Sequence, residues 1–121
     1  MVRQRSGVIL AFGGAGDPLR DYYIGGTQVA FEAVETMRRQ IATELGPHGV
    51  RFVTLRTGGV PEAMGEFEGS EQIAEATVKL TLLGRAATLA DVGEAAAFAA
   101  SDRARTMTGA TINVSCGALL D

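Results

Sequence analysis

A long helix between two short apolar strands is the feature that most constrains the fold of this chain. Residues 7–12 form a continuous apolar run, which predicts a strand buried on both faces, as in a parallel sheet. Residues 26–45 repeat apolar side chains every three to four positions, as a helix does, and residues 51–55 form a second strand-like run. A strand, a helix and a strand joined by short connections form a βαβ unit, so we expect two parallel strands with a right-handed crossover.

The apolar stripe of this helix predicts the side that packs on the sheet. Charged residues such as Glu35 and Arg38 lie largely outside the stripe. Gly46 and Pro47 then predict the end of the helix, with Gly46 in the left-handed conformation. The stripe consists of Ala30, Ala33, Val34, Met37, Ile41 and Leu45.

The remainder of the chain continues the same α/β pattern. Residues 62–70 are acidic with few large apolar side chains, which is typical of a surface segment. Ser70 is a candidate cap for a helix that reaches about residue 82, and Thr88 with Asp91 predicts a capping box that opens a helix to about residue 101. Residues 110–114 read as a third strand. The order is therefore β-α-β-α-α-β, and the fold class is α/β.

Composition excludes several function classes. The formal net charge of −3 argues against a nucleic-acid partner or an anionic membrane surface. No apolar run approaches the roughly 18 residues that a membrane span needs. Cys116 is the single cysteine, which excludes an internal disulfide and fits a reducing cytoplasm, and with a single histidine it makes a structural zinc site improbable. We therefore expect a cytoplasmic protein without a nucleic-acid, membrane or metal partner.

Glycine gathers where the three predicted strands end. Residues 13–17, 57–60 and 115–117 are small and contain glycine, and parallel sheets bind ligands outside the carboxyl ends of their strands. This coincidence favours one binding crevice, while the alternative is that the glycines only make tight turns. A dinucleotide-phosphate loop at residues 13–16 is disfavoured, because Leu19 stands where a third glycine is needed and Asp17 adds negative charge.

The titratable residues form no catalytic constellation. His48 lies in a connection, where solvation or a bond to a carbonyl is the expected role, and Cys116 is expected to be a small packed residue. Tyr22 and Tyr23 precede the long helix, and packing at its entrance is favoured over proton donation.

Taken together, several segments resemble the short-chain dehydrogenase/reductase family. The most specific one contains Glu-Leu-Gly-Pro-His-Gly-Val-Arg at residues 44–51. The resemblance covers essentially the whole chain, but only the carboxyl-terminal half of the family's domain. The segments that carry it are residues 6–10, 39–51, 83–85, 99–102 and 108–114.

The resemblance implies a partial Rossmann-like, three-layer α/β/α fold. Residues 1–121 would form one carboxyl-terminal part of a domain that binds NAD or NADP, with strands equivalent to the family's strands five, six and seven. The amino-terminal half, which carries the family's phosphate-binding loop, is absent from this sequence. The loop after strand six usually contacts the nicotinamide, which implies cofactor contacts for Thr57, Gly58, Gly59 and Val60.

The catalytic positions depart from the family pattern. The family uses a Ser and a Tyr-x-x-x-Lys pair, and an alignment without gaps places these positions at Gly14, Thr27 and Phe31. The threonine hydroxyl has no accessible acidity near neutral pH, and the phenylalanine has neither charge nor donor. A positioned acid or base contributes about 10²–10⁴ in rate. The resemblance therefore implies a divergent branch without the usual catalytic residues, and whether the chain is an enzyme stays open.

Three interpretations of the function remain. The first is an oxidoreductase-like protein that is truncated and does not catalyse alone. The second is a non-catalytic assembly module, a homo-oligomer formed through helix 26–45, the carboxyl-terminal strand or the exposed edge of strand 7–12. The third is a fragment of a full-length divergent oxidoreductase, which the DNA upstream of the Met1 codon distinguishes from a genuine half-protein.

Overall fold

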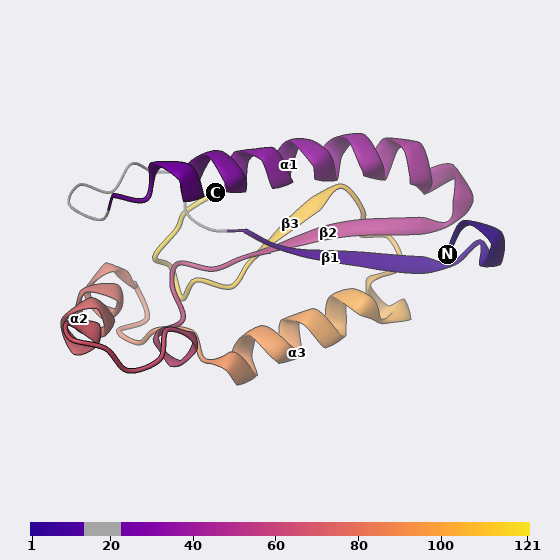
Figure 1. Ribbon diagram of the computed structural model, residues 1–121. Coiled ribbons are helices and arrows are strands. Elements are labelled where there is room, and N and C mark those ends of the chain that lie inside the picture. The colour runs from indigo at the N-terminus through magenta and orange to yellow at the C-terminus, as the bar shows by residue number, and fades with distance from the viewer. Residues whose placement is uncertain (14–22) are drawn as a thin grey trace.

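The computed structural model describes residues 1–13 and 23–121, and its elements follow the predicted order β-α-β-α-α-β. Figure 1 labels them along the chain. Short 3₁₀ turns lie between several of them. The elements are β1 (Gly7–Gly13), α1 (Gly25–Leu45), β2 (Val50–Arg56), α2 (Ser70–Leu80), α3 (Leu89–Ala100) and β3 (Ala110–Asn113).

The described strands form one parallel sheet in the order β1-β2-β3. Gly13 of β1 is in register with Arg56 of β2, which is in register with Asn113 of β3. The predicted parallel βαβ unit is confirmed. Because all three strands run the same way, their carboxyl ends meet at one edge of the sheet.

Helices cover both faces of this sheet, so the predicted three-layer α/β/α architecture is confirmed. Figure 1 shows α1 on one face and α3 on the other. On the α3 side, Val53 and Leu55 of β2 form the core with Val92 and Ala99 of α3. The small residues of α3 let the helix approach the sheet closely, which extends the contact between these apolar surfaces.

The prediction that residues 7–12 are buried on both faces is wrong. Most of β1 is half-buried, and the side chain of Phe12 is 62% exposed. Within the described residues, β1 pairs with β2 alone and is an edge strand. The unpaired edge itself agrees with the exposed edge of strand 7–12 that the assembly interpretation expects.

The face that α1 turns to the sheet also differs from the prediction. Arg38 is only 7% exposed, whereas Met37 of the predicted stripe is 53% exposed and Val29 is 71% exposed. The sheet therefore receives a side of the helix that contains Glu35 and Arg38, and part of the apolar stripe faces outward. The predicted packing side is thus only partly correct: Val34, Ile41 and Leu45 of the stripe are half-buried, whereas Ala30, Ala33 and Met37 are exposed.

The end of α1 shows a further difference. Gly46 keeps a right-handed conformation (φ −54°), and the chain continues into the 3₁₀ turn Gly46–His48. Gly49 takes the left-handed conformation instead, with φ 74°. A Cβ at Gly49 would lie 2.3 Å from the backbone oxygen of Arg5, so glycine is required there for space as well as for φ.

The starts of α2 and α3 contrast with each other. Ser70 does not cap α2, because Gly69 holds the cap position with φ 93° and no side chain provides a cap bond. The capping box of α3 is confirmed: Thr88 Oγ1 accepts from the amide of Asp91 at 3.0 Å, and Asp91 Oδ2 accepts from the amide of Thr88 at 3.0 Å. Arg85 Nη1 lies 2.6 Å from Asp91 Oδ2. The hydrogen bond from Arg85, together with those from Thr88, lowers the pKa of Asp91 to about 2.

Residues 62–68 are exposed, as the acidic composition predicts. Glu62 has a role that composition did not reveal, since its Oε2 accepts from the amide of Leu89 at 2.9 Å, at the start of α3. In the part of the chain that the structure describes, no helix combines the length and the apolar character that a bilayer crossing requires.

Candidate functional site

The candidate site is the carboxyl edge of the sheet, where the strands end side by side at Gly13, Arg56 and Asn113. Figure 1 shows α1 running antiparallel to the strands, so that the beginning of this helix lies toward the same edge. The predicted meeting of the three strand ends is confirmed. What fills the edge is decided by the loops that follow β2 and β3.

The loop after β2 packs against other parts of the chain. A Cβ at Gly58 would lie 2.6 Å from Cβ of Ala118 and 3.2 Å from Cβ of Ser115. At Gly59, with φ 116°, a Cβ would lie 3.0 Å from Cγ2 of Thr77. These two glycines therefore permit close packing against the carboxyl-terminal turn and α2.

The two ends of this loop are also held in place. The amide of Thr57 donates to the carbonyl of Gly13 at 3.2 Å, which extends the pairing of β1 and β2 beyond Arg56. Val60 packs against the apolar core. All four residues predicted to contact a nicotinamide therefore lie at the carboxyl edge, at the end of the central strand.

The predicted catalytic positions carry no group that titrates near neutral pH. Gly14 lies outside the described residues. Thr27 is exposed and Phe31 is half-buried, and they lie one turn apart on α1. A hydroxyl and a phenyl ring at these positions offer neither a general acid nor a cation.

The remaining titratable candidates do not assemble a second site. Tyr22 lies outside the described residues, and Tyr23 is 96% exposed, so the predicted packing at the helix entrance is wrong for Tyr23. His48 is exposed, as expected. Cys116 is a half-buried free thiol. Across residues 1–13 and 23–121, no three His, Cys, Asp or Glu side chains are grouped to hold a metal ion.

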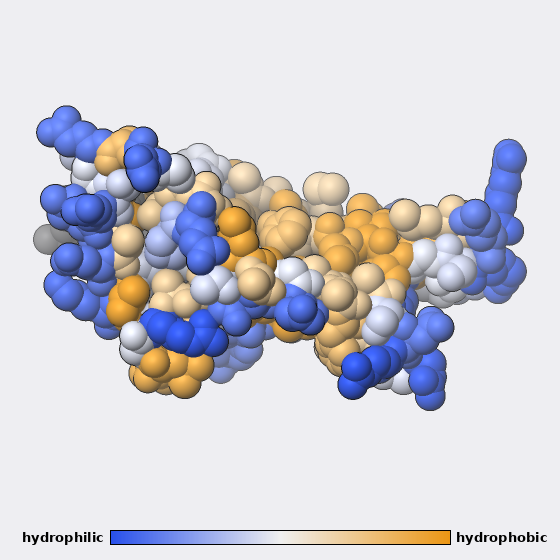
Figure 2. Space-filling model, turned by 90° about the horizontal axis from the view of Figure 1, so that it is seen from below, coloured by the Kyte–Doolittle hydropathy of each residue, from blue (hydrophilic) through white to orange (hydrophobic). Residues whose placement is uncertain are grey.

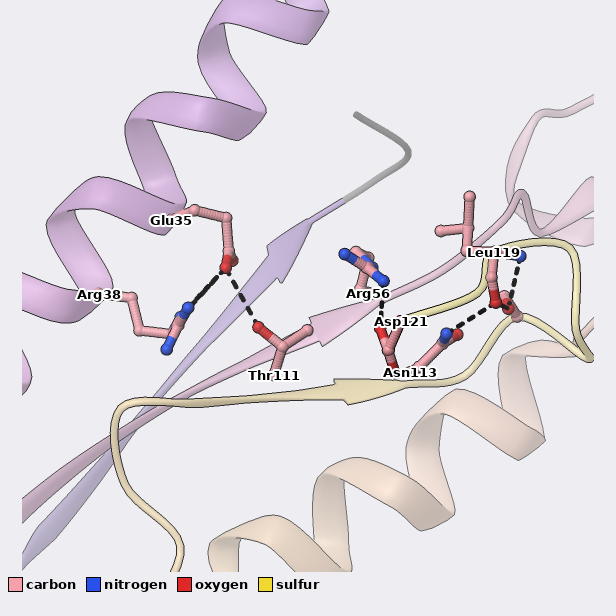
Figure 3. Close-up of polar contacts among 8 residues, drawn as sticks. Glu35, Arg38, Arg56, Thr111, Asn113, Leu119 and Asp121 are labelled. Atoms are coloured by element: carbon pink, nitrogen blue, oxygen red, sulfur yellow. Dashed lines mark hydrogen bonds and ion pairs between the residues drawn. The ribbon is translucent and has the colours of Figure 1, made fainter. Parts of the chain in front are cut away.

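A polar cluster under α1 was not predicted. Glu35 Oε2 accepts from Arg38 Nη2 at 2.8 Å and from Thr111 Oγ1 of β3 at 3.1 Å. Arg38 also donates through Nη1 to the carbonyl of Gly109. Figure 3 shows Glu35 and Arg38 reaching from α1 toward Thr111 on β3. The cluster ties the helix to the last strand.

Electrostatics keep this cluster charged. Burial raises the pKa of the Glu35 carboxyl, but the hydrogen bond and the charge of Arg38, with the hydroxyl of Thr111, more than offset it. The net pKa therefore lies below the usual value near 4.5. Glu35 is ionised at neutral pH and paired with a nearly buried guanidinium.

A second polar layer lies nearer the carboxyl edge. Arg56 and Asn113 are register partners, two residues beyond the pair Thr54 and Thr111. Two strand residues span about 6.6 Å, and one helical turn spans about 5.4 Å. Because α1 is antiparallel to the strands, Phe31 is displaced toward this second layer by one turn from Glu35. Arg56 at the end of β2 and Phe31 on α1 therefore lie at the same height along the strand direction.

The carboxyl-terminal turn folds back over this layer. Asn113 Nδ2 donates to the carbonyl of Leu119 at 2.9 Å, and the amide of Leu119 donates to Ser115 Oγ at 3.1 Å. Two residues later, Asp121 forms an ion pair with Arg56 Nη2. Figure 3 shows the turn bringing Leu119 and Asp121 to the two strand ends. Sequence reasoning gave Arg56 no role in the site, although a charged residue that ends a buried strand was a visible signal.

A pocket adjoins the other side of this turn. Its volume is about 500 Å³, and the ion-paired Arg85 and Asp91 form part of its wall. The carbonyl of Cys116 accepts from the amides of Leu82 and Leu83, each at 3.1 Å, which fixes the wall to the segment after α2. The lining residues are Leu83, Arg85, Asp91, Asn113, Val114, Ser115, Cys116, Gly117 and Leu119.

Known proteins resemble this chain over nearly its whole length. A family model described as enoyl-(acyl carrier protein) reductase matches residues 1–118. The enoyl-(acyl-carrier-protein) reductase (NADH) of Aquifex aeolicus is 32% identical over 120 residues, which are 97% of this chain and 44% of that relative.

Solved structures agree with this match. A short-chain type dehydrogenase/reductase from Mycobacterium ulcerans superposes with a TM-score of 0.85 at 29% identity, covering 98% of this chain and 43% of that one. The Bacillus cereus enoyl-acyl carrier protein reductase, determined with NADP+ and an indole naphthyridinone, superposes with a TM-score of 0.79 at 28% identity, covering 96% and 46%. The chain spans less than half the length of each of these proteins.

Proposed function

The chain belongs to the short-chain dehydrogenase/reductase family, and from this premise we propose that it forms the carboxyl-terminal part of a nicotinamide-dependent oxidoreductase domain and does not turn over substrate alone. Its relatives include reductases that are named for NADH or solved with NADP+. Residues 1–121 are then one part-domain. A cytoplasmic location is part of the same proposal.

The observation that carries this proposal is the chemistry of α1. Where family members place a tyrosine and a lysine, this helix has the exposed Thr27 and the half-buried Phe31. Loss of a positioned acid or base removes about 10²–10⁴ in rate. We therefore expect proton transfer to be the step in which this chain fails.

The residues present fit a nicotinamide cofactor only in part. Thr57, Gly58, Gly59 and Val60 are the proposed contacts, and they lie at the correct edge of the sheet. The open side of Gly58, however, is filled by Ala118 and Ser115. Phe31 has no donor for a ribose hydroxyl. We therefore derive no chemical step through the cofactor.

Cofactor binding by the full chain tests the proposal. We expect the fluorescence of NADH and NADPH to stay unchanged up to micromolar protein, while circular dichroism shows the α/β fold. We also expect no oxidation of NADH with carbonyl or enoyl substrates. Micromolar binding of either nucleotide, or measurable turnover, would overturn the idea that the chain is inactive alone.

Assembly through an exposed surface is the second candidate function. Phe12 of the edge strand β1 is 62% exposed, and Val29 and Met37 on the outer side of α1 are 71% and 53% exposed. An unpaired edge strand offers backbone donors and acceptors to another chain. The candidate is a homo-oligomer formed through this edge, through α1 or through β3.

Light scattering over a concentration series tests this candidate. We expect a mass above that of the 12.6 kDa monomer. Phe12→Lys weakens an oligomer that uses the β1 edge, and Val29→Glu weakens one that uses α1, so the pair identifies the surface. A monodisperse monomer at high concentration would refute the assembly function.

A further inference from the structure

We propose that Arg56 is a carboxylate-binding residue at the carboxyl edge of the sheet, and that Asp121 occupies it in the free chain as a displaceable internal carboxylate. The ligand class is a small organic anion that presents a carboxylate to the guanidinium. This inference goes beyond the proposed function, because it requires neither a bound nicotinamide nor turnover.

The position of Arg56 is the first argument. It is the last residue of the central strand, between Gly13 of β1 and Asn113 of β3, at the edge where parallel sheets bind ligands. Its side chain is 26% exposed, so its charge is partly withdrawn from water. A guanidinium stays charged at every physiological pH, which makes it a permanent anion receptor.

The unsatisfied hydrogen bonds are the second argument. Nε of Arg56 is buried and has no hydrogen-bond partner in the described structure, and the same holds for Oδ1 of its neighbour Asn113. Buried donors without partners are rare in folded proteins. Asp121 engages Arg56 through Nη2 alone. A carboxylate that reached Nε and Nη2 together would complete the bidentate pair that arginine favours.

The exposure of Asp121 is the third argument. Its side chain is 67% exposed, and within the described residues the bonds that anchor the turn end at Leu119, which bonds to Asn113 and Ser115. Asp121 can therefore leave Arg56 without breaking the anchoring bonds of the turn. Exposed ion pairs of this kind are weak, so a ligand in excess exchanges with the internal carboxylate. Figure 3 shows this separation between the anchored part of the turn and the ion pair.

The experiment follows the Nε–Hε signal of Arg56 by NMR in the full ¹⁵N-labelled chain, assigned by its loss in Arg56→Lys. Acetate is titrated at pH 7 and at constant ionic strength, with chloride as the compensating anion, into the natural chain, Asp121→Asn and Glu68→Gln. Glu68 is exposed, so its variant removes the same charge away from the edge. Inorganic phosphate is titrated in parallel.

We expect acetate to shift the Arg56 signal and to bind Asp121→Asn about two- to five-fold more tightly than the natural chain, the range that corresponds to an exposed ion pair. Glu68→Gln should bind like the natural chain. In Arg56→Lys, acetate should change the chemical shift of the Asn113 side-chain amide less than in the natural chain. Lysine keeps the positive charge but lacks the two parallel N–H donors that bind a carboxylate.

Three results would overturn the proposal. One is an Arg56 signal that acetate leaves unmoved in Asp121→Asn, with the dispersion of the amide spectrum intact. Another is equal tightening in Glu68→Gln, which would mean that net charge alone matters. The third is tighter binding of phosphate than of acetate, which would exclude a carboxylate site. Cofactor binding is measured separately, so its failure leaves this test unaffected.

Discussion

Replacing Arg38 by methionine should expose how much the cluster under α1 contributes to stability. Arg38 is 7% exposed, and it donates to Glu35 through Nε at 3.2 Å and through Nη2 at 2.8 Å, and to the carbonyl of Gly109. Methionine keeps most of the side-chain volume and removes all these donors. The change therefore leaves a poorly solvated carboxylate and a backbone carbonyl without their partner.

The expected cost at pH 7 is about 3 kcal/mol. Removing one partner of a buried ion pair typically costs 3–5 kcal/mol. The lower end applies, because the side chain of Glu35 is 20% exposed and keeps its bond from Thr111. The neighbouring Arg39→Met is the matched control: Arg39 is exposed and, among the described residues, its side chain donates only to Thr36, so a change within about 0.5 kcal/mol is expected.

The cost of Arg38→Met should depend on pH, in a direction that follows from the pKa of Glu35. In the natural chain the pKa of Glu35 is lowered, so its stabilising effect is full above the unfolded value near 4.5 and is lost as the pH falls through the lower folded value. In Arg38→Met the hydrogen bond and the charge of Arg38 no longer lower that pKa, while burial still raises it and Thr111 still lowers it. The pKa of Glu35 is therefore higher than in the natural chain, so protonation on acidification relieves the penalty. The difference between the two proteins should therefore narrow from pH 7 to pH 4.

Urea unfolding of the full chain, followed by circular dichroism at both pH values, measures these differences. In Glu35→Leu/Arg38→Met, the uncompensated charge is gone, and we expect most of the lost stability to return. A cost below 1 kcal/mol for Arg38→Met, or a cost that stays constant with pH, would refute the view that Glu35 and Arg38 act as a charged pair under the helix.

Three further predictions concern single residues, each measured by urea or thermal unfolding. Thr88→Ala removes the α3 cap and should cost about 1 kcal/mol, while Thr88→Ser should cost little. Gly58→Ala would place a Cβ 2.6 Å from Cβ of Ala118 and should cost about 1–3 kcal/mol, whereas Gly93→Ala, in a helix with open space around it, should stabilise by about 0.5–1 kcal/mol. Cys116 has φ 53°, so Cys116→Gly should stabilise by about 1 kcal/mol and Cys116→Ala should not. The reverse order within any pair would contradict these arguments.

The arrangement of elements was predictable because it depends on local patterns. The apolar runs, the long periodic segment and the Thr88–Asp91 box each act within a few residues, and all three were found where the structure has them. Short connections then left a parallel pairing as the usual solution for β1 and β2. Similarity to the family, covering most of the chain, added the order of the remaining strand.

The surroundings of these elements were not predictable in the same way. The apolar run of β1 predicted burial on both faces, but most of the strand is half-buried and Phe12 is 62% exposed. Similarly, the apolar stripe of α1 holds Met37, whereas the sheet receives Arg38. Glu35 compensates the charge of Arg38 there, and Thr111 of β3 donates to the same Glu35 carboxylate. The periodic pattern of one helix cannot reveal a partner such as Thr111, because that residue lies on a strand far away in the sequence.

The apolar side chains that this packing leaves exposed have a physical consequence. Figure 2 shows apolar residues spread over the face seen from below, the side of α3 in Figure 1. Leu89 and Phe98 of α3 are 55% and 42% exposed, on the face opposite to Val29 and Met37 of α1. Apolar surface is thus uncovered on both helical layers as well as on the edge strand. One partner surface that covered only the edge would leave the outer helix sides in water, so variants on α1, on α3 and at Phe12 distinguish which of these surfaces an association uses. Large exposed apolar patches often mark interaction sites, which supports the proposed association.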